Sequence, residues 1–124
     1  MDFSTPARCF DLLGLSEKEI RKQIIGDQKI ITENLEGLGS YLSFEHQDDK
    51  VRGQFRFFSL DSTCNEILII APKTLKKAYT DFMNKRFKNN KNGTWTSDDN
   101  TVKVSISKIG KELMMISLLR ISKT

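Results

Sequence analysis

The chain has 124 residues, 38% of them hydrophobic and 29% charged, so it is long enough for one domain with a real core, and its composition argues against disorder. No apolar run approaches the roughly 18 residues of a membrane helix, and residues 1–10 lack the charged and apolar segments of a secretory signal. We therefore expect a cytoplasmic protein if Met1 is the native start, and an exported one if a signal peptide was removed.

The formal net charge of +4 is distributed unevenly along the chain. Residues 1–71 carry 8 Lys and Arg against 12 Asp and Glu, whereas residues 72–124 carry 12 against 4. An excess of cations attracts anionic partners, although such residues also simply keep a surface solvated. The C-terminal half is therefore the candidate region for contact with a polyanion.

Two short helices are predicted at the start of the chain. The first opens at Ser4-Thr5-Pro6, where a hydroxyl caps the helix and proline fits its first turn, and Gly14 ends it. Ser16 and Glu19 have the spacing of a capping box for a second helix. A DNA-reading helix-turn-helix has the same outline, but Phe10 is too large for the close crossing of its helices. We therefore expect a helix pair that packs on a sheet.

Strands are predicted next, because apolar residues begin to alternate with polar ones. The alternating segments are 29–36, 40–46 and 51–57. The run 66–71 is apolar at successive positions, which is typical of a central strand that is covered on both faces. These patterns indicate three or four strands before the next helix.

A long helix follows Pro72. Apolar residues recur at helical spacing between residues 74 and 87 and are expected to face the sheet. They are Leu75, Ala78, Tyr79, Phe82, Met83 and Phe87. A polar loop is predicted over 88–93, and strands are predicted around Trp95, over 102–107 and over 113–121.

The predicted fold is thus a single α+β domain over residues 1–124, with elements in the order α-β-β-β-(β)-α-β-β-β. Its sheet is mostly antiparallel, with N-terminal helical segments and one long helix, about 73–88, packed on one face. Both halves of the chain share a plan of one helix followed by hairpins. An ancient duplication would leave such a plan, although no residue-level repeat supports one.

Catalysis and metal binding are not indicated by the sequence. The single histidine, His46, adjoins Glu45 on a predicted strand, where neighbouring side chains point to opposite faces. The spacings CxxC, HExxH and HxH are absent. Cys9 and Cys64 lie among apolar residues, which favours two reduced thiols over a disulfide. We therefore expect a protein that is not an enzyme and that holds no metal or cofactor.

The basic helix is one candidate binding surface. Residues 72–91 contain 7 Lys and Arg against 1 Asp, and lysines on an exposed helix can contact phosphates. The aromatic residues of this helix lie on its inward stripe, so stacking on bases is not indicated. The candidate residues for a polyanion are Lys73, Lys77, Lys85, Lys88 and Lys91.

The sheet face away from the long helix is the other candidate surface. If no second layer of the protein packs there, it displays Arg52, Arg56, Phe58 and Lys103 together, and arginine and aromatic residues dominate protein interfaces. The sequence therefore predicts a non-catalytic binding or assembly module that contacts another protein through this face. Binding of nucleic acid or another polyanion through residues 73–91 is the alternative. The sequence does not indicate the partner's identity or the oligomeric state.

Overall fold

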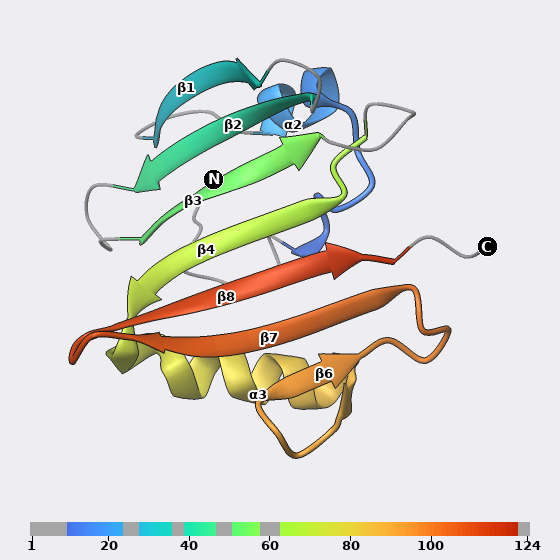
Figure 1. Cartoon of the computed structure of the whole chain (residues 1–124), viewed down its shortest axis with the longest axis vertical. Helices are drawn as coiled ribbons and strands as arrows, with labels where there is room; N and C mark the ends of the chain where they lie inside the picture. The colour runs from blue at the N-terminus through green and yellow to red at the C-terminus, as the bar shows by residue number, and fades with distance from the viewer. Residues whose placement is uncertain (1–9, 24–27, 36–38, 47–50, 58–62, 122–124) are drawn as a thin grey trace.

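One antiparallel sheet of eight strands organises the protein (Figure 1). The computed structural model describes residues 10–23, 28–35, 39–46, 51–57 and 63–121, with the backbone alone for 28–35, 39–40 and 44–46. The strands are β1 Gln28–Leu35, β2 Gly39–His46, β3 Val51–Phe57, β4 Glu66–Pro72, β5 Lys88–Asn89, β6 Thr94–Thr96, β7 Val102–Ile109 and β8 Leu113–Arg120. The prediction of a small α+β domain with a mainly antiparallel sheet is confirmed.

The order of the strands gives the sheet an approximate two-fold arrangement. The strands lie side by side as β1-β2-β3-β4-β8-β7-β6-β5, so each half of the chain forms a meander and the last strands of both meanders pair at the centre. A helix precedes each meander, namely α2, Glu17–Gln23, and α3, Lys76–Arg86. Because β4 and β8 are antiparallel, a half-turn about the Ile69–Ile116 pair relates the strand order of one half to that of the other.

A capping box begins α2, as the sequence predicts. The Ser16 backbone N–H donates to Glu19 Oε1, and the Glu19 backbone N–H donates to Ser16 Oγ, each at 3.2 Å. These bonds satisfy donors that the first turn of a helix leaves without partners. Gly14 has φ +92°, the left-handed conformation expected where the preceding turn ends. Ser4-Thr5-Pro6, the predicted start of the first helix, lies outside the described residues.

The core lies between the helices and one face of the sheet. Successive residues of a strand point to opposite faces, so every second residue of β4 and β8 enters the core. These residues are Ile67, Ile69, Ala71, Met114, Ile116 and Leu118, all at most 2% exposed. The helices complete the core from the other side with Ile20 of α2 and with Tyr79 and Met83 of α3, all fully buried.

The predicted long helix is shorter than its pattern indicates. Residues Lys73–Leu75 form a 3-10 turn, η1, and α3 covers only Lys76–Arg86. Phe82 of α3 is half-buried, and its ring meets that of Phe10 edge to face with 5.2 Å between centroids. Ala78 was expected to face inward but is exposed. Consecutive helical residues are about 100° apart, which turns Ala78 away from the sheet.

Polar side chains join α3 to the outer strands. Trp95 Nε1 of β6 donates to Asn84 Oδ1 of α3 at 2.8 Å, and Asn89 Nδ2 of β5 donates to the same oxygen at 3.0 Å. The prediction of a loop over 88–93 is wrong for its first two residues, which pair with β6 as β5. The Asn89 side chain anchors them to α3, and this tertiary contact overrides the low strand propensity of Lys-Asn.

Candidate functional site

The two central strands carry apolar side chains on both faces. In β4, Ile69 is fully buried toward the helices, whereas its neighbours Leu68 and Ile70 point the other way and are half-buried. In β8, Met115 is half-buried on that outer side and Leu119 is 38% exposed. Both described helices insert their buried residues on the opposite side, and in Figure 1 α3 lies behind the sheet. We call this outer surface, which no described element covers, the open face.

An apolar strip runs along the centre of the open face. It consists of Leu68, Ile70, Leu113, Met115 and Leu119. Ile70 pairs directly with Met115 across the β4–β8 ladder, whereas Leu68 pairs with Ser117 and Leu119 pairs with Glu66, so the strip is interrupted by Ser117 and ends beside a carboxylate. Directly opposed side chains on neighbouring strands are about 5 Å apart, close enough to contact each other. The strip is therefore one surface made by two strands that are far apart in the sequence.

A basic residue lies beside the strip on each neighbouring strand, among the polar residues Gln54 of β3 and Ser105 and Ser107 of β7. Arg52 of β3 pairs with Ile70, and Lys103 of β7 pairs with Leu119, so a cation follows the strip on each neighbouring strand. Arg52 and Lys103 are exposed, and Arg56 is half-buried. Three of the four residues predicted for protein binding thus share the open face. The fourth, Phe58, lies outside the described residues.

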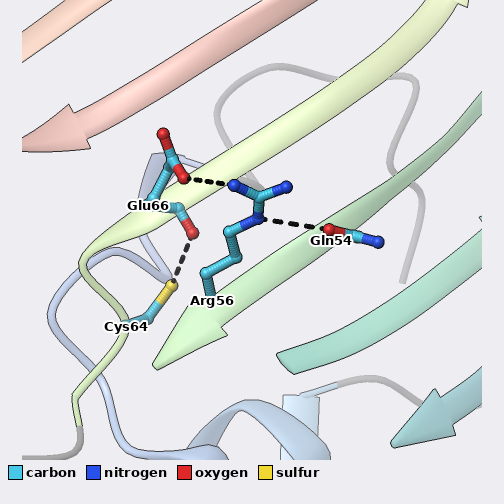
Figure 2. A network of polar contacts seen from close by, with 4 residues as sticks. All are labelled: Gln54, Arg56, Cys64 and Glu66. Carbon is cyan, nitrogen blue, oxygen red and sulfur yellow. Dashed lines mark hydrogen bonds and ion pairs between the residues drawn. The ribbon is translucent and has the colours of Figure 1, made fainter. Parts of the chain in front are cut away.

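Arg56 is held in a small polar network at one end of the open face (Figure 2). Its Nη1 donates to Glu66 Oε1 at 2.9 Å, and its Nε donates to Gln54 Oε1 at 3.2 Å. Glu66 stands opposite Arg56 in the β3–β4 ladder, so the register itself brings the two charges together. Arg56 therefore has an anionic partner within the protein, which reduces the charge that it offers to a ligand.

The thiol of Cys64 lies beside this network but belongs to the core. Cys64 is a free, fully buried cysteine, and its Sγ donates to the Glu66 carbonyl oxygen at 3.4 Å. Burial raises its pKa from 9.0 to about 12, because a thiolate loses its hydration there. Cys9, its predicted reduced companion, lies outside the described residues.

The lysines predicted for polyanion binding do not form a single surface. Of the predicted residues, Lys73, Lys77 and Lys85 are exposed on the helical segment. Lys88 alternates with Asn89, whose side chain reaches α3, so Lys88 points to the open face instead. Lys91 is exposed in the turn before β6, with φ +64°. The alternation of β5, which the sequence pattern did not reveal, separates Lys88 from the helix.

The apolar strip is the part of the face that sequence reasoning missed. Its signal is present in the sequence, because β4 and β8 are apolar at successive positions, but for residues 66–71 this pattern predicts a strand covered on both faces. In the described part of the chain, no helix is long and apolar enough to span a membrane. His46 ends β2 where the backbone alone is described.

No three His, Cys, Asp or Glu side chains among the described residues are grouped as ligands for a metal ion. Comparison of the chain with protein-family models gives no match, and neither a curated protein nor a solved structure matches it significantly.

Proposed function

We propose that the chain is a non-catalytic binding or assembly module whose open face takes a partner protein. The observation that carries this proposal is the apolar strip on the outer side of the two central strands. Covering apolar surface releases about 25 cal/mol per Å² removed from water, so a second protein layer on this strip is favourable. Apolar surface with a polar border is typical of protein interaction sites.

The charged residues beside the strip would make binding of the partner specific. Arg52 and Lys103 are exposed on either side of it, and Arg56 is oriented by its bonds to Glu66 and Gln54. Arginine can combine packing of its alkyl chain with several hydrogen bonds, which is why it is enriched at interface hot spots. An apolar centre with a polar, cationic border has the anatomy of a protein interface.

The proposal is of a module without catalytic activity. Burial raises the pKa of Cys64, the one described cysteine, to about 12, whereas an activated cysteine has a lowered pKa, so Cys64 is not an activated nucleophile. Substitution of the single histidine, His46→Ala, is expected to leave the function of the protein intact. An enzymatic activity that this substitution abolishes would contradict the proposal.

A polyanion site on the helical side is the second candidate function. Lys73, Lys77 and Lys85 are exposed on η1 and α3, and lysines of this kind neutralise phosphates. The aromatic residues of α3 favour the first proposal, since Tyr79 is fully buried and Phe82 packs on Phe10. They are therefore not free to stack on bases, as single-strand binding proteins do.

Capture of partners by the immobilised chain separates the two functions. Extract of the cells that make the protein is applied with and without nuclease, at two salt concentrations. We expect partners that survive nuclease and respond weakly to salt, because a protein contact depends mainly on buried groups. A phosphate contact weakens steeply and log-linearly with salt, since binding releases counterions.

Matched variants locate the contact. We expect Leu119→Asp on the open face to abolish capture, whereas Lys108→Glu should retain it. Lys108 is exposed in β7 but alternates with the open-face residues of that strand, so it controls for added negative charge. If nuclease removes every partner and Lys73→Glu, Lys77→Glu and Lys85→Glu together abolish capture, the polyanion function replaces the first proposal.

A further inference from the structure

We infer that the open face binds an amphipathic α-helix of a partner protein, with an apolar stripe flanked by acidic residues. This inference rests on the proposed function and specifies its partner. The apolar strip and the two cations beside it, Arg52 on β3 and Lys103 on β7, are the features that define the ligand. Each of three properties of the face, namely its dimensions, its saturated backbone and its charge, points to this occupant.

The dimensions of the strip fit one helix. It is two strands wide, and strands are about 4.8 Å apart, so the strip and its borders give a surface comparable to the 10–12 Å diameter of a helix. Along its length, β4 spans the seven residues Glu66–Pro72. At about 3.3 Å per residue, this is roughly 20 Å, which a helix of about 13 residues covers.

The hydrogen bonding of the sheet favours a helix over an extended segment. The backbone groups of β4 are used on both sides, in its ladders with β3 and β8, and β8 likewise pairs with β4 and β7. A ligand on the open face therefore meets side chains only. An extended strand lying there would bury its own N–H and C=O groups without partners, whereas a helix satisfies them internally.

The charges beside the strip favour a helix that has acidic residues on both sides of its apolar stripe. Among the described side chains of the face, Glu66 is the only carboxylate, and Arg56 pairs with it at 2.9 Å. Arg52 and Lys103 follow the strip on β3 and β7, one on each side. Glu45 stands opposite Arg52 in the β2–β3 ladder, so Lys103 is the cation better suited to a test. Asp or Glu residues on a docked helix would meet these cations, whereas Lys or Arg would be repelled.

Peptide display tests the predicted chemistry and does not require the partner to be identified. A library of random peptides of about 18 residues, long enough for five helical turns, is selected on the whole chain. Counter-selection uses the Leu119→Asp variant, after thermal unfolding has shown that it is folded. We expect enriched sequences with apolar residues at positions i, i+3 or i+4 and i+7, and with Asp or Glu beside them. Enrichment of basic peptides, or of peptides without helical spacing, would overturn the inference.

Titration of an enriched peptide then tests the charged borders. We expect Lys103→Glu to raise the dissociation constant about tenfold, which corresponds to about 1.4 kcal/mol. Lys108→Glu, in the same strand but on the other face, should leave it unchanged within the error of the measurement. Replacing the acidic residues of the peptide by lysine should weaken its binding to the wild-type chain. The same lysine peptide should bind the Lys103→Glu variant more tightly than it binds the wild-type chain. Equal effects of the two lysine variants would overturn the inference.

The failure of this inference is distinguishable from failure of the proposed function. If captured partner proteins depend on Leu119 but the enriched peptides have another chemistry, the inference is wrong and the proposed function stands. If Leu119→Asp captures the same partners as the wild type, the proposed function is wrong as well. Labelled single- and double-stranded DNA is titrated in parallel. DNA binding that Lys103→Glu abolishes and Lys108→Glu does not would place nucleic acid on the open face and overturn both.

Discussion

The two faces of the central strands are built from similar residues but have different environments. In β4, Ile69 is fully buried while its neighbour Ile70 is half-buried; in β8, Leu118 is 1% exposed while Leu119 is 38% exposed. The covered face packs on helices that the chain supplies, and the open face has no such layer among the described residues. Hydropathy thus marks a strand as central, whereas the position of the helices decides which of its faces becomes core.

Two adjacent leucines allow the strongest test of this difference. Leu118→Asp should prevent folding, because it buries an unpaired carboxylate at a site that is 1% exposed. Leu119→Asp should give a folded protein, because its carboxylate reaches water. Circular dichroism and thermal unfolding of both variants measure the contrast. A folded, cooperatively melting Leu118→Asp variant would show that the core is not on the side described.

Two adjacent isoleucines test the same difference with a milder change. Ile69→Ala should lower the free energy of unfolding by about 2–5 kcal/mol, because it removes buried methyl groups and leaves a cavity. Ile70→Ala should cost about 1 kcal/mol or less, since half-buried side chains lose less contact on truncation. Urea unfolding gives both values. Equal losses would mean that a layer of the protein covers the open face after all.

The pH dependence of stability tests the burial of Cys64 in the core. Its pKa is raised from 9.0 to about 12 by burial. Between these values the unfolded chain has lost the thiol proton and the folded chain keeps it. The free energy of unfolding should therefore fall as the pH rises above 9, by up to about 1.4 kcal/mol per pH unit. Cys64→Ala should remove this component of the slope, and an unchanged slope would contradict the burial of the thiol.

Substitutions that break one polar contact on each face should lower the free energy of unfolding by more similar amounts. Asn84→Ala leaves Trp95 Nε1 without its 2.8 Å acceptor near the core and should cost about 1–2 kcal/mol. Glu66→Gln weakens a 2.9 Å ion pair on the open face and should cost less than about 1 kcal/mol, because water solvates both groups in part. Urea unfolding of the two variants ranks them. A larger loss for Glu66→Gln would show that the open face is drier than its exposure indicates.

Much of the fold could be predicted because it depends on local patterns. The capping box of Ser16 and Glu19 and the left-handed Gly14 both occur where the sequence indicates them. Strand alternation also places Arg52, Arg56 and Lys103 on one face. These features depend on residues close in sequence or on a period of two, so they do not require the tertiary structure.

The remainder depends on contacts between distant segments. Strand β5 pairs with β6, and Asn89 also bonds to Asn84 on α3; strand propensity predicts neither contact. The open face depends on which side of β4 and β8 the helices occupy, and these strands are apolar on both sides. Pairing of Arg56 with Glu66 depends on the β3–β4 register. A single sequence contains no direct signal for any of these three contacts.

The pairing of β4 with β8 has a consequence for the synthesis of the chain. Each is the last strand of its half. One edge of β4 pairs with β3 and the other with β8, and β8 likewise lies between β4 and β7. While a ribosome makes the chain, β4 emerges well before β8. During this time the edge of β4 that later pairs with β8 has no neighbouring strand, and the side chains of β4 are apolar on both faces. Such an edge can pair with other chains and begin aggregation. The C-terminal half therefore protects the N-terminal half, and a chain truncated before β8 would be at risk of aggregation even if its first four strands formed.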